Sequence, residues 1–532
     1  MDLTSVEHMC EGGLPGGAEL GSLSAAGLID AARACARAEN IAASRKLAVM
    51  AELFDRRTQL PCAEDRSNWW VDPDAAVAAE LGAALGVNQW LALTQTQRAV
   101  ALRDRLPRVA ALFAQGLISD MLVRTILTRT ELITDPQALA AVDDALARQV
   151  GFWSALSRTK IEQAIDATVI ACDPAAQRTA TDTAGRSLDF GYPTDPAGLV
   201  SLQARMHAHD AAALYDRITT IAATVCPADP RTSDQRRYDA LAAISYGLDT
   251  LACTCSLPDC DAATARPPTP NTTVYLITDA TCSTQPATAD PPDAGTPTPT
   301  ETAELASAPE APAPAPAPAP AASAPGSAFL FGRGVLPPAL VAPMLANARI
   351  REIVHPGQRP AESRYLPSPA LAEFVCCRDL TCRFPNCEVP ATHADIDHTV
   401  PYPLGPTHAS NLKCLCRFHH LLKTFWVGPD GWSERQHPDG TIEWTSPTGH
   451  TYTTKPGSSL LFPALCRPTA TLWVNGPPPT PTPTPRRGTM MPRRRYTRAQ
   501  AHARYITALR KTNTGVDPHR EHPPNAIGTP PF

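Results

Sequence analysis

The stretches "HADIDHTVPY" (393–402) and "NLKCLCRFHHLLKTF" (411–425) decide how the second half of the chain folds. They bring acidic side chains, an asparagine, cysteines and a histidine pair into one short region, and "CRFPNC" (382–387) lies just upstream. Carboxylate, imidazole and thiolate groups are the side chains that most often bind metal ions in proteins. Their concentration here indicates a structure that depends on metal.

The length and charge of the whole chain set outer limits. With 532 residues the chain is too long for one compact core, so we expect two or three domains. The formal net charge of -5 does not by itself indicate a nucleic-acid partner. The segment after residue 485 is nevertheless rich in arginine. This local excess of positive charge predicts either contacts with phosphates or a solvated, disordered tail.

The 16 cysteines and the N-terminal sequence bear on the compartment. The start, "MDLTSVEHMCEGG", has no basic segment followed by an apolar one, so no signal peptide is expected. No run is long and apolar enough to span a bilayer, so no membrane partner is expected. We therefore expect a cytoplasmic protein, in which clustered cysteines more often bind metal than form disulfides.

Composition divides the chain into segments. Residues 283–326 consist mainly of Ala, Pro, Thr and Ser, and proline favours extended, unpaired backbone, so this is predicted to be a disordered linker. Residues 20–282 before it are expected to form a mostly helical domain. Residues 327–475 form a second domain with its core at 376–426. Residues 476–532 are a Pro/Thr-rich and then basic tail, for which disorder is predicted.

The first segment shows helix patterns. Residues 24–57 are rich in good helix formers, and "DPDAAVAAELGAALG" (72–86) starts with Asp-Pro and stops at a glycine. "DPQALAAVDDALARQV" (135–150) starts in the same way, whereas "RSLDFGY" (186–192) and "TTVYLIT" (272–278) have β character. The cysteines of "CTCSLPDC" (253–260) are either ordinary buried thiols or zinc ligands. In the second case the ligands are Cys253, Cys255 and Cys260, with Cys282 as a candidate fourth.

The spacing of the later cysteines predicts a structural zinc site. Two pairs, C-x4-C and C-x2-H, flank a segment of moderate length, which fits a tetrahedral Cys3His site. The predicted ligands are Cys382, Cys387, Cys416 and His419. Cys414 competes with them for the ion, Cys376 and Cys377 are surplus, and the alternative is a set of scattered thiols beside a surface histidine.

With His419 assigned to zinc, His420 remains free, and Asp397, His398, Asn411 and His420 complete an ordered motif. This region resembles an HNH endonuclease domain of the ββα-metal type, in the variety that carries a zinc knuckle. One departure is that His419 stands where that variety usually has a fourth cysteine, and histidine is also a zinc ligand.

A wider resemblance follows from the helical segment, the linker, "YLPSPALAEFVCCRDLTCRFPNC" (365–387) and pieces such as "DPRTSDQRRYDALAAI" (229–244). Together they resemble an actinobacterial 13E12 repeat family protein, in which an N-terminal domain of unknown function precedes an HNH domain. The implied fold is a mainly α N-terminal domain plus a small α+β (ββα-metal, HNH) zinc-stabilised domain, joined by a disordered Ala/Pro-rich linker.

The resemblance implies a site and a reaction. Asp397 and His420 would bind one divalent cation, Mg²⁺ or Mn²⁺, in addition to the structural Zn²⁺. His398 would act as the general base, and Asn411 would fix the hairpin loop through bonds to the backbone. His398, Asn411 and His420 are thus the expected catalytic residues of an endonuclease that hydrolyses phosphodiester bonds in DNA.

Other interpretations remain open on the sequence alone. The chain could be a zinc-stabilised DNA-binding protein that does not cleave, or a protein that self-associates through its helical domain. A binding protein needs only the zinc ligands, whereas Asp397, His398 and His420 are intact here, which favours the enzyme. Contacts with the DNA backbone are conceivable for Tyr402, Arg417 and Lys423, although Lys423 also suits a solvated helix.

Overall fold

The structure of the protein is a computed structural model, and it divides into two compact units. It describes residues 17, 20–59, 66–177, 187–192, 195–255, 257–262, 275–278, 328–345, 348–474, 476, 478–479 and 490–513. Unit 1 comprises Met1–Thr183, Gly357–Pro456 and Pro468–Phe532, and unit 2 comprises Ala184–Pro356 and Gly457–Arg467. The predicted linker, 283–326, lies outside the described residues, and so does Cys282.

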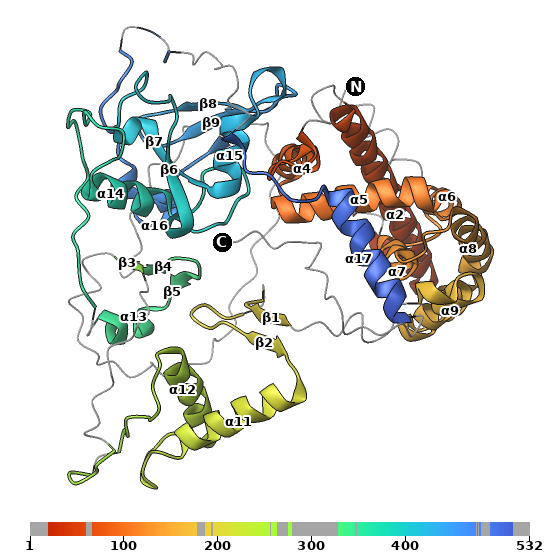
Figure 1. Ribbon diagram of the computed structural model, residues 1–532, viewed down its shortest axis with the longest axis horizontal. Coiled ribbons are helices and arrows are strands. Elements are labelled where there is room, and N and C mark those ends of the chain that lie inside the picture. The colour runs from red at the N-terminus through yellow and green to blue at the C-terminus, as the bar shows by residue number, and fades with distance from the viewer. Residues whose placement is uncertain are drawn as a thin grey trace. The chain divides into compact units, whose positions relative to one another are not determined.

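The first part of unit 1 is helical, as the sequence predicted. Its helices are α2 (Ala25–Thr58), α4 (Pro73–Leu85), α5 (Gln89–Arg105), α6 (Pro107–Ala114), α7 (Asp120–Thr130), α8 (Pro136–Gln149) and α9 (Arg158–Cys172). The short 3-10 turns η1 (Leu20–Ser22), η2 (Val150–Ala155) and η3 (Pro174–Ala176) flank them. Helix α2 packs against α4, α5, α6 and α7, whereas α8 and α9 pack on α6 and α7 (Figure 1).

The ends of these helices follow from the predicted start and stop residues. Asp72 and Asp135 accept backbone N–H bonds at the N-termini of α4 and α8, in each case just before a proline. Gly86, at a φ of 68°, ends α4 in the left-handed region that a side chain would disfavour. Ile165 and Val169 of α9 point into the helical core, one turn apart.

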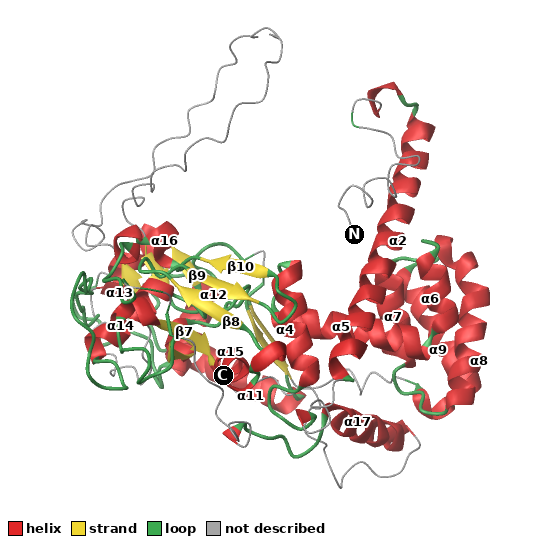
Figure 2. Cartoon of the chain, turned by 90° about the horizontal axis from the view of Figure 1, so that it is seen from above, coloured by secondary structure: helices red, strands yellow, loops and turns green. Residues whose placement is uncertain are grey.

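The later part of unit 1 combines helices and small sheets. Its elements are α14 (Pro369–Asp379), η5 (Ala391–His393), β6 (Ala394–His398), η6 (Ala409–Asn411), β7 (Leu412–Cys416), α15 (Arg417–Phe425), η7 (Gly428–Asp430), β8 (Ser433–Gln436), β9 (Ile442–Thr445) and β10 (Thr451–Thr454). Strands β6 and β7 pair antiparallel, with Asp397 opposite Lys413. Strands β8, β9 and β10 form a separate antiparallel sheet (Figure 2).

Helix α4 and strands from the later part of the chain share one buried core. The predicted division of the chain at residues 283–326 did not anticipate this. Ala75 and Ala79 of α4, together with Trp69, pack in the same buried cluster as Phe384 and Trp444. The indole N–H of Trp426 donates to the carbonyl of Val71 at 2.9 Å. The domain boundary drawn at residue 282 therefore has to be corrected, because α4 shares its buried face with residues from after the linker.

The basic tail also differs from the prediction of disorder. Residues Arg498–Asn513 form helix α17, and Ile506 is buried in the helical core of unit 1. Arg494 and Arg498 both form ion pairs with Asp72, and Arg510 pairs with Asp173 at 2.6 Å. These three arginines are bound within the chain, so the predicted excess of free positive charge is smaller than the sequence implied.

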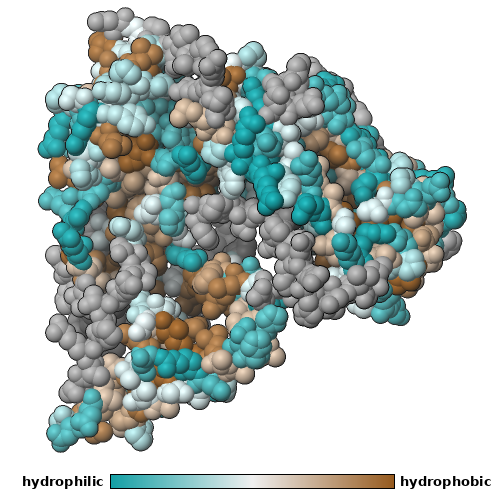
Figure 3. Space-filling model, viewed as in Figure 1, coloured by the Kyte–Doolittle hydropathy of each residue, from teal (hydrophilic) through white to brown (hydrophobic). Residues whose placement is uncertain are grey.

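Unit 2 contains small sheets and a helix pair. Its elements are β1 (Ser187–Phe190), β2 (Leu202–Arg205), α11 (Ala208–Ala222), α12 (Ser233–Ser245), β3 (Leu276–Thr278), β4 (Ala328–Leu330), β5 (Gly334–Leu336), α13 (Pro338–Leu345), α16 (Ser458–Leu461) and η8 (Pro463–Cys466). The predicted β runs correspond to β1 and β3. Leu188, Phe190 and Leu202 of the β1–β2 hairpin are exposed, in an area where Figure 3 shows apolar side chains at the surface.

Among the described residues, no single helix combines the length and the apolar character needed to cross a membrane.

Candidate metal centre and catalytic site

The four predicted zinc ligands lie together. The ligand atoms of Cys382, Cys387, Cys416 and His419 are all within 4.8 Å of one another. His419 Nδ1 is 3.2 Å from Cys416 Sγ and 3.6 Å from Cys382 Sγ. A tetrahedral zinc ion with Zn–S bonds of about 2.3 Å and a Zn–N bond of about 2.0 Å needs separations of roughly 3.5–3.8 Å between its ligands. This Cys/His group can therefore hold a metal such as zinc.

Local structure brings these ligands to one point. Cys382 and Cys387 are joined by a tight turn in which Asn386 takes a φ of 57°, a value that asparagine tolerates better than most residues. Cys416 ends β7 and is also the N-cap residue of α15, so His419 follows in the first turn of that helix. The ring of Phe384 stacks on His419 with 3.9 Å between their centroids, which shields the cluster from water.

Burial and the neighbouring sulfur atoms set the protonation of the cluster. Burial raises the pKa of the Cys382 thiol well above its usual value. Burial lowers the pKa of His419, but the neighbouring Cys416 and Cys387 thiolates outweigh this effect and raise that pKa to about 9. Buried sulfur and nitrogen atoms at these distances have to share protons, and a divalent cation replaces those protons when it binds.

Cys414, which competed for the ion in the sequence, lies apart from this group. Its Sγ is 3.9 Å from the Sγ of Cys376, and its backbone N–H donates to the buried carboxylate of Asp379. Cys414 and Cys376 are thus neighbours in the packing between β7 and α14, and they are not members of the Cys/His group.

Asp397 and His420 meet on the other side of α15. Asp397 Oδ1 lies 3.5 Å from His420 Nε2. The other ring nitrogen, Nδ1, is 2.8 Å from Asp395 Oδ2, and this contact lowers the pKa of Asp395. Asp395 and Asp397 are two positions apart on β6 and so lie on one face of the strand. Nε2 of His420 and Oδ1 of Asp397 are close enough to bind one cation.

Asp395 was not among the predicted site residues. The motif "DIDH" (395–398) contains it, and the alternation of side chains along a strand was the available signal. A carboxylate that accepts Nδ1–H fixes the tautomer of an imidazole and leaves the Nε2 lone pair free for a metal.

Two lysines hold the second oxygen of Asp397. Asp397 Oδ2 is 2.6 Å from Lys413 Nζ and 2.5 Å from Lys423 Nζ. Glu434 accepts from the same ammonium groups at 2.8 and 2.6 Å. Burial raises the pKa of Asp397, but Lys413 and Lys423 outweigh it and hold that pKa far below its usual range. The carboxylate is therefore ionised, with Oδ2 bound to ammonium groups and Oδ1 facing His420.

His398 ends β6 and is only 6% exposed. Its Nε2 lies 2.9 Å from Thr407 Oγ1, and that hydroxyl donates to the carbonyl of Arg364 at 2.5 Å. A hydroxyl has one proton, so Nε2 of His398 must be the donor in the first bond, which leaves its lone pair on Nδ1. Burial lowers the pKa of His398, so the ring is neutral near pH 7. Tyr365 stacks on it at 5.4 Å.

Asn411 holds the loop that follows β6. Its Oδ1 accepts from the N–H of Val400 at 2.8 Å, and its Nδ2 donates to the carbonyls of Val400 and Pro406 at 3.0 and 2.9 Å. Gly405 closes the same loop, where a Cβ would come within 2.2 Å of Val400 O. These contacts hold the loop that begins directly after His398.

A buried ion group fixes the start of β7. Asp379 accepts from Arg378 at 2.8 Å and from Arg383 at 3.2 Å. Arg378 also donates to the carbonyls of Ala409 and Leu412, which flank Asn411. Because all three charged side chains are almost fully buried, removing Asp379 would leave two buried arginines without their counter-charge.

The side chains considered for DNA contact are engaged within the chain. Tyr402 donates to the carbonyl of Ser363 at 3.2 Å, Arg417 lies 3.3 Å from Asp395, and Lys423 belongs to the lysine–carboxylate group.

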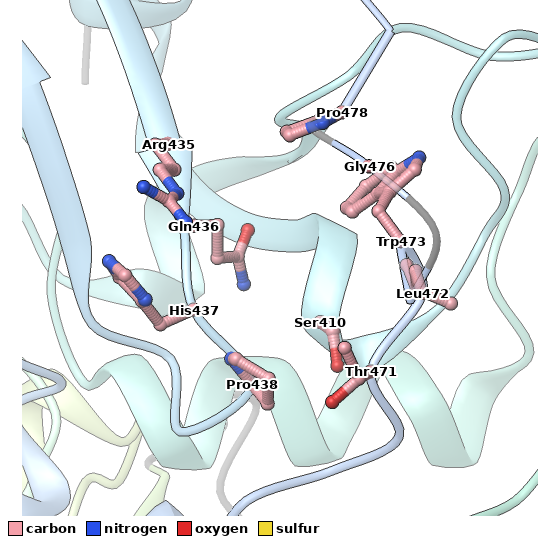
Figure 4. A pocket seen from close by; sticks show the side chains of 10 residues that line it. All are labelled: Ser410, Arg435, Gln436, His437, Pro438, Thr471, Leu472, Trp473, Gly476 and Pro478. Atoms are coloured by element: carbon pink, nitrogen blue, oxygen red, sulfur yellow. The ribbon is translucent and has the colours of Figure 1, made fainter.

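One pocket among the described residues lies apart from this chemistry. It measures about 390 Å³, and its lining is Ser410, Arg435, Gln436, His437, Pro438, Thr471, Leu472, Trp473, Gly476 and Pro478. Figure 4 shows the residues of 435–438 along one wall and those of 471–478 along the other. Gln436 connects the pocket to the site, because its amide donates to the carbonyls of Ala409 and Leu412.

Comparison with known proteins identifies relatives over nearly the whole chain. A family model described as "Domain of unknown function (DUF222)" matches residues 34–379. The match begins in α2 and stops before Cys382, so it does not include the strands and helix that carry the site. No solved structure gives a significant match.

Several curated relatives come from Mycobacterium tuberculosis. "Uncharacterized protein Rv2100" of strain ATCC 25618 / H37Rv is 44% identical over 530 residues, which cover 98% of this chain and 94% of the relative. "Uncharacterized protein Rv3776" of the same strain is 44% identical over 518 residues, covering 96% and 94%. A shorter relative, "Uncharacterized protein in est 3'region", is 40% identical over 363 residues, which are 67% of this chain and 97% of that protein.

Proposed function

The chain belongs to the DUF222 family, and we propose that it is a metal-dependent endonuclease that hydrolyses phosphodiester bonds in DNA through an HNH-type site at 394–425. The observation that carries the proposal is the 3.5 Å distance between Asp397 Oδ1 and His420 Nε2. Asp397 directly precedes His398, the proposed general base. The antiparallel β6–β7 pair followed by α15 supports the resemblance to the ββα-metal type and, with the helical first half, to the 13E12 repeat family.

The donor set suits a small hard cation. One carboxylate oxygen and one imidazole nitrogen leave most positions of an octahedral Mg²⁺ or Mn²⁺ for water and phosphate oxygens. When bound, the cation would offset the negative charge that develops on the scissile phosphate and on the departing oxygen. Asp395 binds Nδ1–H of His420 and so keeps His420 in the tautomer whose Nε2 lone pair faces the cation.

His398 has the properties of a general base. It is neutral near pH 7, and its Nε2–H bond to Thr407 orients the ring with the basic lone pair on Nδ1. In the proposed reaction Nδ1 takes a proton from the attacking water. Asn411 acts through the backbone, because its bonds to Val400 and Pro406 fix the loop that begins after His398.

The zinc group and the lysines have supporting roles in this proposal. Zinc on Cys416 and His419 would fix the junction between β7 and α15, and therefore the position of His420 on that helix. Lys413 and Lys423 orient Asp397 by holding Oδ2, so that Oδ1 faces the cation.

The test is a cleavage assay on plasmid and single-stranded DNA with Mg²⁺ or Mn²⁺. Asp397→Ala and His420→Ala should each abolish cleavage and weaken binding of the divalent cation, with partial rescue at high metal concentration. Glu443→Ala is the control, since Glu443 is an exposed carboxylate of the neighbouring sheet that pairs with His437.

Two results would redirect the proposal. If the parent protein binds DNA without cutting it under any of these metals, the protein is a zinc-stabilised DNA-binding protein. If it neither binds nor cuts DNA but sediments as an oligomer, then self-association through the helical part of the chain becomes the leading function.

A further inference from the structure

A second group of cysteines lies in unit 2 and shares no residue with the proposed catalytic site. Cys226, Cys253, Cys255 and Cys260 place all four sulfur atoms within 4.8 Å of one another. Cys226 follows helix α11, and the other three lie in the segment that follows α12. The sequence suggested three of these cysteines as ligands but not Cys226, which is 27 positions before Cys253 and separated from it by a helix.

A network of buried polar contacts holds the two segments against each other. Asp229 accepts from Arg231 through both carboxylate oxygens, at 2.9 and 2.7 Å, and from the backbone N–H of Thr254 at 3.0 Å. Arg231 also donates to the carbonyl of Ala252. The turn after Cys226 is therefore bonded to the segment around Cys253 at several points, independently of the sulfur atoms.

The distances fit one mononuclear ion. Zn–S bonds of about 2.3 Å in a tetrahedron put neighbouring sulfur atoms about 3.8 Å apart. Cys226 Sγ and Cys253 Sγ are 3.4 Å apart, well beyond the roughly 2.05 Å of a disulfide bond. A polynuclear iron–sulfur cluster does not fit a group with every sulfur pair within 4.8 Å, because its iron and sulfide atoms hold the four cysteine sulfurs farther apart.

The apolar contacts in this region are few. The buried cluster between α11 and α12 consists of Ile221, Ala240, Ala243 and Leu251, and two of these four are alanines. So small a core contributes little to folding, and small modules of this kind are often stabilised by a structural metal. Four thiolates around one ion would link the end of α11 to the segment after α12.

We propose that Cys226, Cys253, Cys255 and Cys260 bind one structural Zn²⁺ in unit 2. Four cysteine ligands leave no open position for water or substrate, so the ion has a structural role. Binding replaces the thiol protons, including the one that Cys253 shares with Asp229 at 3.4 Å. Asp229 remains satisfied, because Arg231 and Thr254 continue to donate to it.

The zinc content of the full-length protein tests this proposal. Protein purified under reducing conditions from zinc-supplemented culture should contain two zinc ions per chain, one in each cysteine group. Cys226→Ser and Cys382→Ser should each retain one zinc ion. Cys172→Ser is the matched control, because Cys172 lies at the end of α9 outside both groups, and this variant should retain two.

Two measurements keep the proposal open to refutation if a variant misfolds. The parent protein with Co²⁺ in place of zinc should show the charge-transfer absorption of a tetrahedral site with four sulfur ligands, in addition to that of the Cys3His site. Thiol titration of the denatured protein should find Cys226 and Cys253 reduced. A single zinc ion per parent chain that Cys226→Ser retains, two zinc ions in Cys226→Ser, or a disulfide between Cys226 and Cys253 would each overturn the assignment. None of these outcomes depends on whether the protein cleaves DNA.

Discussion

The two sides of helix α15 use the same kind of residue for different purposes. His419 joins three cysteines and lies under the ring of Phe384, whereas His420, the next residue, faces Asp395 and Asp397. The first group offers three soft sulfur atoms and one nitrogen, which complete a tetrahedron. The second offers one hard oxygen and one nitrogen, which leave a cation mostly uncovered. Ligand number and softness, more than the presence of histidine, separate a structural site from a reactive one.

The two groups also differ in whether charged side chains surround them. The Cys/His group packs with the aromatic rings of Phe384, Trp432 and Trp444, which carry no charge. The carboxylate side has Lys413, Lys423 and Glu434 within bonding distance of one another. Such a network adjusts to a change of charge during a reaction, whereas an aromatic shell only excludes water. Variants on the carboxylate side should therefore change activity while zinc content stays constant.

Among variants that keep both proposed ligands of the divalent cation, the largest expected effect is on His398. Replacing His398 by alanine should lower cleavage by roughly two to four orders of magnitude, the usual contribution of a positioned general base. Zinc content, affinity for Mg²⁺ and affinity for DNA should stay near those of the parent, because His398 is not proposed as a ligand. His393→Ala is the matched control, since His393 is an exposed histidine just before β6. Cleavage measured beside metal titration decides the matter, and a His398→Ala protein that cuts at the parental rate would refute the mechanism.

An intermediate effect is expected at Asp395. Asp395→Asn keeps the size of the side chain but removes the charge that holds Nδ1–H of His420 at 2.8 Å. A carboxylate that accepts from the second ring nitrogen of a metal-binding histidine typically contributes roughly 10- to 100-fold to metal affinity or activity. For Asp395→Asn, the affinity for Mn²⁺ and the cleavage rate should each decrease by a factor in this range. Zinc should stay bound to the Cys/His group. The readouts are the Mn²⁺ affinity, measured by calorimetry, and the cleavage rate. Equal values for Asp395→Asn and a Glu443→Gln control would show that Asp395 does not position His420.

Local signals in the sequence predicted much of this arrangement. The Asp-Pro starts predicted α4 and α8, and the C-x4-C and C-x2-H spacings identified Cys382, Cys387, Cys416 and His419 as one group, which the structure confirms. These features depend on neighbours within a few residues. Helix ends and the Cys/His group can therefore be predicted from the sequence alone.

Contacts between segments far apart in the chain could not be predicted from the sequence. Helix α4 is apolar on nearly all sides, which predicts burial but not the partner, and only the fold shows that it packs with Phe384 and Trp444. Cys226 stood alone in the sequence until α11 and α12 brought it to Cys253. The tail followed a proline tract that suggested disorder, but the ion pairs of Arg494 and Arg510 with distant aspartates hold it on the helices. Each of these is a pairing over a long sequence separation, for which spacing carries no information.

The smallest expected effect concerns Lys423, and it tests whether the lysines only orient Asp397 or also oppose the cation. Lys423→Met keeps the length of the side chain but removes the ammonium group that lies 2.5 Å from Asp397 Oδ2 and 2.6 Å from Glu434. Without that charge the site is more negative, so Mn²⁺ should bind roughly threefold to tenfold more tightly. This is much less than the ~4 kcal/mol between two unit charges 4 Å apart at an effective dielectric constant of about 20, because Lys413 still neutralises part of the carboxylate charge.

Affinity for Mn²⁺ without DNA is the proper readout for Lys423→Met, since it separates the electrostatic effect from contacts with phosphate. Lys455→Met is the matched control, because Lys455 is an exposed lysine that directly follows β10 in the same unit. Weaker Mn²⁺ binding in Lys423→Met would mean that the position of Asp397 matters more than the local charge. The carboxylate side of α15 would then resemble the zinc side, as a rigid frame whose charges serve mainly to fix geometry.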